Sequence, residues 1–329
     1  MEYIYDLNLL LPGDVILKRD PVCKISDRVM TSTNSEFSHA MLYLGNSSYI
    51  DVGRRVQARN LQRYVFESPE NTCLLRLKKE FWDGDTIYRA IQYARSVVAE
   101  PYSIRDALNL EAGRILTYTD NTQICTRLVS KAYEYAGLKI VDNIEMCTPQ
   151  EIKESKSLHT IEGCCRVASD FDIRFSKTHD VVDDMIEATD KLIVSLVGYG
   201  DGKLRSIENI TNYAINHPQD DDSIAELLQA SGYLDVLDLD KQYNAYQYNP
   251  VAFLDFYKEK YRDAALQLVN ANLSDVRMYE NELNKYRMIQ SMLNFDSKYL
   301  QLQIDLYNRI IDSYRQRAFV GMLVLNNLF

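Results

Sequence analysis

Three residues in the first half of the chain could together perform nucleophilic chemistry: Cys125, His39 and Asp51. A thiolate attacks carbonyl carbons, an imidazole can take up and return the proton, and a carboxylate can hold that imidazole in one orientation. These residue types are the parts of a cysteine nucleophile with its base and its orienting acid. The chemistry would be acyl transfer through a thioester, provided that the fold brings the three side chains together.

His39 and Asp51 are expected to meet through a hairpin. They lie on the strand-like runs 39–44 and 49–52, which are joined by the turn-forming residues Gly45-Asn46-Ser47. If the loop is 44–46, His39 lies directly opposite Asp51, with Cβ atoms roughly 4.5–5.5 Å apart on one face. A loop that differs by one residue would place the two side chains on opposite faces. The pairing therefore depends on the turn.

Cys125 is expected at the start of a helix that runs to about residue 136 and ends before Gly137. The positive end of the helix dipole and the unpaired N–H groups of the first turn favour the thiolate there. The backbone N–H of Cys125 is then the expected oxyanion donor. Each residue alone also fits a plainer role: a buried thiol, a packed strand histidine and a strand-end aspartate.

The strands and helices that would position these residues can also be predicted. Strands are expected at 15–17, 39–44, 49–52 and 72–77, and helices at about 85–99, 125–136 and 148–155. Residues 158–169 read as a closing strand pair or an extended segment. The pattern predicts an α+β domain over residues 1–175.

The order of these motifs resembles the circularly permuted papain-like proteins of the NlpC superfamily, in the branch of YiiX, YaeF-like proteins and lecithin–retinol acyltransferase. The resemblance covers roughly residues 10–170 and implies a permuted papain-like domain with a Cys125, His39 and Asp51 triad. In such a domain an antiparallel sheet packs on the helix that bears the cysteine. Relatives often have Glu or His where this chain has Asp51. The matching segments are Gly13-Asp14, Ser38-His39, Asp51 and Cys125-Thr126-Arg127-Leu128-Val129.

The resemblance also singles out two residues for the substrate pocket, Tyr102 and Ser38. Pro101-Tyr102 resembles a Pro-Tyr ahead of the family's cysteine helix, although Ser103 follows where relatives usually have Asp. Packing or a turn hydroxyl is the plainer role for Tyr102.

From about residue 180 the strand signals stop, which predicts an all-α helical bundle domain over residues 176–329. Its Tyr-rich stripes favour a helix–helix core, and the alternative is a groove that binds a partner protein. The run at 318–325 is expected to be a docked final helix or, alternatively, a lipid-facing segment. The apolar stripes are Phe253, Phe256, Tyr257, Tyr261, Ala264 and Leu268; Val276, Tyr279, Leu283, Tyr286, Ile289 and Leu293; and Leu300, Ile304, Tyr307, Ile311 and Tyr314.

Composition narrows the class of protein. The net charge is −10, from 47 acidic against 37 basic residues, and no basic run occurs, which disfavours nucleic acid as a partner. The start has no signal-peptide pattern, and no apolar run is long enough for a transmembrane segment. We therefore expect a cytoplasmic protein, with delivery by a specialised secretion system as an alternative.

The six cysteines lie at 23, 73, 125, 147, 164 and 165 and show neither CxxC nor zinc-type spacing. The sequence therefore predicts free thiols, no metal and no organic cofactor. We expect a cysteine hydrolase that cuts an amide, peptide or isopeptide bond. A lipid acyl hydrolase or acyltransferase is the alternative chemistry, and a non-catalytic protein that binds its partner through the helical domain is the alternative class.

Overall fold

The computed structural model describes residues 1–19, 24–103 and 123–327. The chain divides into two compact units, Met1–Thr178 and His179–Phe329, and the fold is α+β: antiparallel sheets in the first unit and helices in the second. The sequence-based boundary after residue 175 falls inside the short helix Asp170–Ser176.

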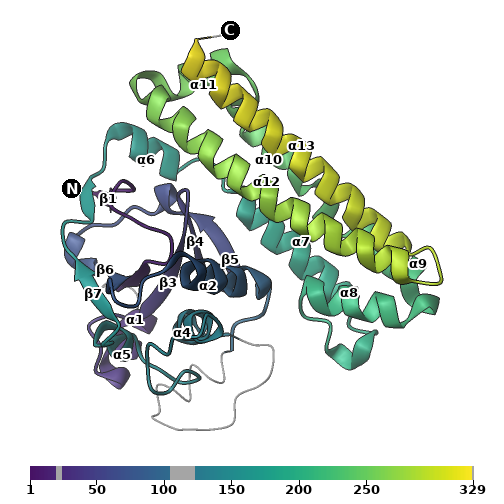
Figure 1. Ribbon diagram of the computed structural model, residues 1–329, viewed down its shortest axis with the longest axis horizontal. Helices are drawn as coiled ribbons and strands as arrows, with labels where there is room; N and C mark the ends of the chain where they lie inside the picture. The colour runs from purple at the N-terminus through teal and green to yellow at the C-terminus, as the bar shows by residue number, and fades with distance from the viewer. Residues whose placement is uncertain (20–23, 104–122, 328–329) are drawn as a thin grey trace. The chain divides into compact units, whose positions relative to one another are not determined.

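The main sheet of the first unit is antiparallel and, within the described residues, has the strand order β5-β4-β3-β2-β6-β7 (Figure 1). A separate two-stranded sheet joins β1 to β8. The strands are β1 Tyr3–Tyr5, β2 Val15–Lys18, β3 His39–Gly45, β4 Ser48–Val52, β5 Val56–Asn60, β6 Thr72–Leu77, β7 Leu158–Ile161 and β8 Cys165–Val167. The helices of this unit are α1 Lys24–Thr33, α2 Gly84–Ser96, α4 Cys125–Tyr135, α5 Pro149–Lys153 and α6 Asp170–Ser176.

The strands predicted at 15–17, 39–44, 49–52 and 72–77 are all present, but the expected strand pair at 158–169 is wrong in one respect. Its two strands do not pair with each other, because β7 adds to the main sheet beside β6 whereas β8 pairs with β1. Gly163, with φ +68°, lies in the turn between them. Periodicity indicates that a strand exists, but it does not identify the strand's partner.

The main sheet is buried on both faces, and alternation along the strands sorts its side chains. Val15, Leu17 and Leu42 point to the face covered by α2 and α4. Ile16 and Met41 point to the other face, where they pack with Tyr5 and other aromatic residues. Because side chains alternate between the two faces along a strand, the position of a polar residue at a strand end determines the face on which it lies.

The second unit consists of helices, of which α12 and α13 are long and run side by side (Figure 1). Gly321 of α13 allows their close approach, because a Cβ there would lie 2.7 Å from Val269 Cγ2 of α12. The helices are α7 Val181–Ser195, α8 Ile207–Asn216, α9 Asp221–Ala230, α10 Val236–Tyr243, α11 Pro250–Tyr257, α12 Tyr261–Met292 and α13 Lys298–Asn326.

The three predicted apolar stripes do not correspond to three helices. The first is divided between α11 and the start of α12, and α12 continues through the second because its sequence contains neither Gly nor Pro. Residues 318–325 are the last part of α13 rather than a separate helix, with Val320 and Val324 buried and Phe319 and Met322 exposed. Among the described helices, none combines the length and the apolar character that crossing a bilayer requires.

Candidate active site

The three candidate residues stand at the ends or edges of elements packed against one another. His39 is the first residue of β3, Asp51 lies near the end of β4, and Cys125 is the first residue of α4. Helix α4 packs on β3 and β4 through Leu128, Val129 and neighbouring apolar residues. This packing brings the start of the helix to the end of the sheet where His39 lies.

The His39 and Asp51 side chains meet, although not through the predicted register. Asn46 and Ser47 form a two-residue turn with positive φ at both positions, as a type I′ hairpin turn requires. Tyr43 therefore opposes Tyr49, with a bulge before Gly45. Compared with the prediction, the register shifts by two residues, so His39 and Asp51 are diagonal neighbours rather than directly opposed.

A shift by an even number keeps both side chains on one face. His39 Nε2 lies 3.3 Å from Asp51 Oδ2, within hydrogen-bonding distance, and the side chains of both residues are largely buried. The carboxylate can therefore fix the orientation of the imidazole, and the other ring nitrogen is left for another partner.

That partner is Cys125, whose side chain and His39 each shift the pKa of the other through charge and hydrogen bonding. The backbone at Ala40 and Thr126 also lowers the pKa of the thiol. Ile124 precedes the helix and makes no side-chain cap, so no side chain satisfies the first-turn N–H groups from the capping position. The start of α4 thus presents backbone donors to the thiol and to any group bound next to it.

Electrostatics favour the charged forms of this cluster. Burial is the largest influence on the Cys125 thiol and raises its pKa, but the His39 charge and hydrogen bond outweigh burial, and the net pKa is lowered. Burial also opposes the charged form of His39, yet Cys125 and Asp51 raise its pKa to about 9. The pKa of Asp51 is lowered, because the His39 hydrogen bond and charge overcome burial. The arrangement favours a thiolate–imidazolium pair.

Polar residues of α4 hold the segment that follows the helix. Thr126 Oγ1 donates to the Cys147 carbonyl at 2.7 Å, and Ser130 Oγ donates to the Ile144 carbonyl at 2.7 Å. Arg127, fully buried, makes an ion pair with Glu145 at 3.1 Å. The polar residues around Cys125 are therefore structural, and they fix the helix that carries it.

The two predicted pocket residues occupy different positions. Ser38 precedes β3, and its hydroxyl is 2.6 Å from that of Ser26 and 3.4 Å from the Lys18 carbonyl, so it is engaged with α1 and β2. Tyr102 pairs with Gln123, two residues before Cys125, and is 37% exposed. Tyr102 thus lies beside the chain that leads into α4, and its pocket role stays a prediction.

The other described thiols have different surroundings. Cys147 is fully buried, and burial raises its pKa to about 12. Burial also raises the pKa of Cys73. The Cys164 and Cys165 sulfurs lie 3.6 Å apart, and Cys23 lies outside the described residues. Among these thiols, Cys125 alone has its pKa lowered by a histidine side chain, whereas Cys147, which is close to it in space, is held as the thiol.

Lys18 was missed at the sequence level. It ends β2 directly opposite His39, and its charge acts on both His39 and Asp51. Arg59 of β5 also acts on Asp51. In the sequence, Lys18 is visible only as a lysine that directly follows the strand-like run 15–17. The order of the strands in the sheet is needed to show that β2 lies beside β3, and therefore that Lys18 lies beside His39.

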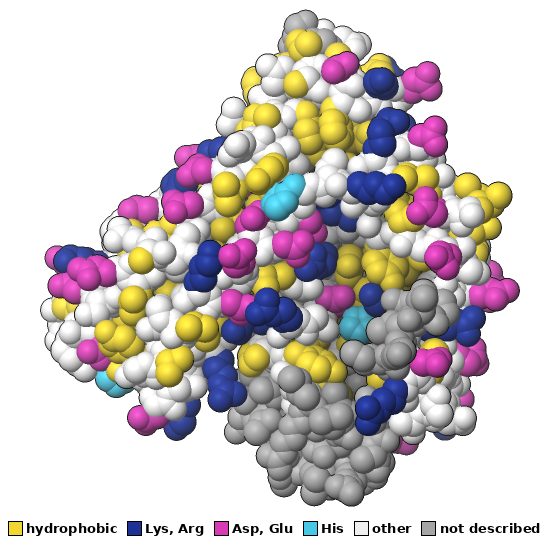
Figure 2. Space-filling view, turned by 180° about the vertical axis from the view of Figure 1, so that it is seen from behind, with side chains coloured by type: hydrophobic (Ala, Val, Ile, Leu, Met, Phe, Trp, Pro, Cys, Tyr) yellow, Lys and Arg dark blue, Asp and Glu magenta, His cyan; other side chains and the backbone are white. Residues whose placement is uncertain are grey.

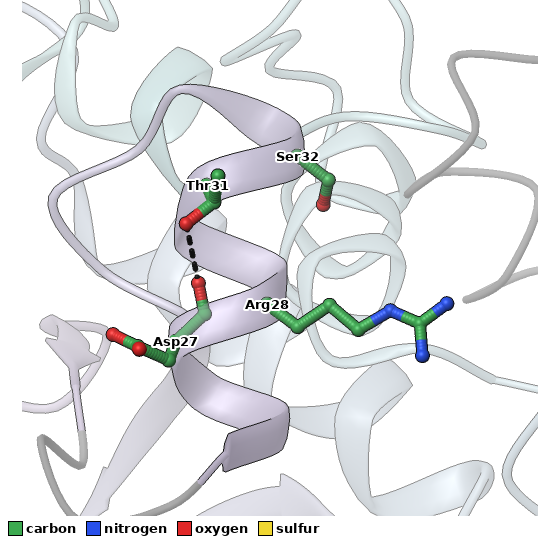
Figure 3. A pocket seen from close by; sticks show the side chains of 4 residues that line it. All are labelled: Asp27, Arg28, Thr31 and Ser32. Carbon is green, nitrogen blue, oxygen red and sulfur yellow. Dashed lines mark hydrogen bonds between the residues drawn. The ribbon is translucent and has the colours of Figure 1, made fainter.

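Two further surfaces of the molecule lie apart from the three candidate residues. A hollow beside α1 is lined by Asp27, Arg28, Thr31 and Ser32, all from this one helix, and contains none of the candidate residues (Figure 3). In it, Thr31 donates to the Asp27 carbonyl at 2.9 Å. On the face drawn in Figure 2, acidic and basic side chains are interspersed with hydrophobic ones. Across the described ranges, no group of three or more His, Cys, Asp and Glu side chains could hold a metal ion.

Part of this chain is similar to solved protein structures. The crystal structure of the metalloprotein YiiX from Escherichia coli O157:H7 aligns with 46% of this chain and 95% of its own, at 16% sequence identity and a TM-score of 0.37. No protein-family model matches the sequence, and no curated protein matches it either.

Proposed function

We propose that this chain is a cysteine-dependent hydrolase that acts through an acyl-thioester on Cys125. The observation that carries the proposal is that His39 Nε2 lies 3.3 Å from Asp51 Oδ2, while the charges of His39 and Cys125 act on each other and lower the pKa of the thiol. The motif order that resembles the permuted papain-like branch agrees with this triad and leads us to propose the same fold family for the first unit.

The reaction would proceed in two steps. The Cys125 thiolate attacks the carbonyl carbon, the bond to the leaving group breaks, and the His39 imidazolium gives its proton to that leaving group. Water then attacks the thioester while neutral His39 takes one of its protons. The carbon–sulfur bond breaks, and the products are the carboxylic acid and the restored thiolate–imidazolium pair. Asp51 orients His39 in both steps, and the backbone N–H of Cys125 stabilises the oxyanion.

An amide, peptide or isopeptide bond is the substrate bond that we favour. An amine leaves from an amide only when it is protonated, and a His39 pKa of about 9 means that the proton is in place at neutral pH. An ester depends less on this proton, because an alkoxide leaves more easily than an amide anion.

Trapping the acyl-enzyme tests the proposal. The full chain is incubated with 4-nitrophenyl acetate and with a panel of peptidyl aminocoumarin amides, and the adducts are mapped by mass spectrometry. We expect an acyl group on Cys125 that hydroxylamine removes, together with release of product.

Cys125→Ala should lose both the adduct and turnover. Cys165→Ala, which removes a half-buried thiol of the same unit, should retain them. Equal turnover in the wild type and in Cys125→Ala, or the same acyl distribution over the remaining thiols, would show that the proposal is wrong.

A further inference from the structure

A lysine stands next to the candidate catalytic histidine and plays no part in the triad. Lys18 pairs directly with His39 across the β2–β3 ladder, so both side chains leave the sheet on the same face. Asp51 shares that face as the diagonal neighbour of His39. Three charged side chains thus occupy one end of the sheet.

The ammonium group of Lys18 is positioned by an aromatic ring. Its Nζ lies 4.6 Å from the centre of the Tyr64 ring, in a cation–π contact. Tyr64 in turn contacts Tyr5, Tyr49 and Phe66. These rings belong to the aromatic cluster on the face of the sheet opposite α4, and they limit where the half-buried lysine side chain can go. The Lys18 charge acts from there on both His39 and Asp51.

Nothing in the described part of the chain neutralises this charge directly. No carboxylate there forms an ion pair with Lys18, and no acceptor there takes a hydrogen bond from its Nζ. Asp51 is engaged by His39 instead. The lysine side chain carries three N–H donors and favours an anionic partner.

We propose that Lys18 binds an anionic group, a carboxylate or a phosphate, on the acyl substrate next to the bond that Cys125 attacks. This inference rests on the proposed function and narrows its substrates to acidic ones. A lysine is a compact point charge and does not by its shape select between the two anions. Arg59, whose charge also acts on Asp51, adds to the positive potential on the same face.

Two alkylating reagents of nearly equal size test the proposal on the full chain. Iodoacetate carries a carboxylate, and iodoacetamide is neutral. We measure the rate of Cys125 alkylation by each at pH 7 and low ionic strength, and compare the ratio of the two rates between variants. In Lys18→Met the iodoacetate-to-iodoacetamide ratio should fall about three- to tenfold, because one nearby positive charge is lost.

Lys18→Arg should keep the ratio close to that of the wild type, since it retains the charge. Lys191→Met is the matched control, because it removes one positive charge from an exposed residue of the second unit and should leave the ratio unchanged. Inorganic phosphate and acetate, tested separately as protectants against iodoacetate, identify the anion: whichever protects the wild type should lose that effect in Lys18→Met.

The outcomes separate this inference from the proposed function. If Cys125 reacts rapidly with iodoacetamide but the ratio is the same in Lys18→Met, or if neither anion protects the wild type, the Lys18 proposal is overturned and the nucleophile stands. If Cys125 reacts with neither reagent faster than an ordinary thiol does, the proposed function itself fails.

Discussion

At the scale of single residues, the central relation is between one thiol and one imidazole. Cys125 and Cys147 are both cysteines of the first unit, but only at Cys125 does His39 lower the pKa of the thiol. Burial is the largest influence on the Cys147 thiol, whose pKa is raised to about 12, whereas the His39 charge and hydrogen bonding outweigh burial at Cys125. The neighbours of a thiol therefore decide its reactivity more than its burial does.

The Asp51 carboxylate should matter less than the thiol and the imidazole. Asp51→Asn keeps the shape and a hydrogen-bonding oxygen, but it withdraws the charge that supports imidazolium. In the 4-nitrophenyl ester assay we expect Cys125→Ala to abolish turnover and His39→Ala to lower it about 10²–10⁴-fold, the usual contribution of acid–base catalysis. Asp51→Asn should lower it about tenfold or more, but less than His39→Ala does.

Circular dichroism of the three variants gives the control. If Asp51→Asn proves as damaging as Cys125→Ala and also unfolds the protein, Asp51 has a structural role rather than an orienting one.

The residue types of the candidate site could be predicted from the sequence, but not all of their neighbours could. A Cys at a helix start and a His and an Asp on adjoining strands are visible as local patterns. The pairing of Lys18 with His39 is a contact between segments separated along the chain, and no local pattern encodes it.

At the scale of elements, the hairpin shows how a wrong register can still give the right contact. The predicted loop 44–46 and the observed turn at Asn46-Ser47 differ by an even shift, so His39 and Asp51 stay on one face. Side chains alternate with a period of two, so a shift of two residues keeps the His39–Asp51 contact although the two residues are no longer directly opposed. Turn type depends on backbone angles that Gly45-Asn46-Ser47 permits in more than one combination.

Helix α4 is held in place by Gly13. Its carbonyl accepts a hydrogen bond from the Tyr133 hydroxyl of α4, and its φ of +89° suits glycine. A Cβ at this position would lie 2.5 Å from Ile87 Cδ1 and 3.3 Å from Tyr133 Oη. Gly13 thus permits the packing that places Cys125 beside His39.

Gly13→Ala should therefore destabilise the first unit. We expect a loss of about 2 kcal/mol in the free energy of unfolding, from backbone strain and overpacking together. Gly84→Ala is the matched control, because the added Cβ meets no atom within 4 Å and should cost little or nothing. Urea unfolding followed by circular dichroism measures both variants, and equal stabilities would contradict this account of Gly13.

At the scale of the whole molecule, each unit has hydrophobic clusters of its own. Two clusters of the first unit flank its main sheet, and two others lie among the helices of the second unit. A unit that has its own core can in general fold alone. Alternation and helical periodicity predicted the two kinds of architecture, but they did not show that α12 spans two predicted stripes.

A fragment of residues 1–178 should fold without the helices that follow. We expect it to unfold cooperatively in urea and to keep the selective reaction of Cys125 with iodoacetamide. The full chain, measured in parallel, is the reference. A fragment that aggregates, or that labels Cys73 and Cys147 as readily as Cys125, would mean that the second unit is required for the fold of the first.

The central claim is that Cys125 and His39 form a thiolate–imidazolium pair, and the pH dependence of Cys125 alkylation tests it most directly. The rate is measured with iodoacetamide from pH 4 to 10 in the wild type and in His39→Ala, with Cys147 as an internal reference that stays unlabelled. The lowered pKa of Cys125 means that the thiolate persists as pH falls below the ordinary thiol value of about 8.5.

We predict that wild-type Cys125 reacts rapidly at pH 6–7, that its rate falls only at lower pH, and that a change near pH 9 marks deprotonation of His39. In His39→Ala the midpoint should rise by a unit or more, because burial then acts on the thiolate without an opposing charge. Identical profiles in the two proteins, with Cys125 titrating at or above the ordinary thiol value, would contradict the account.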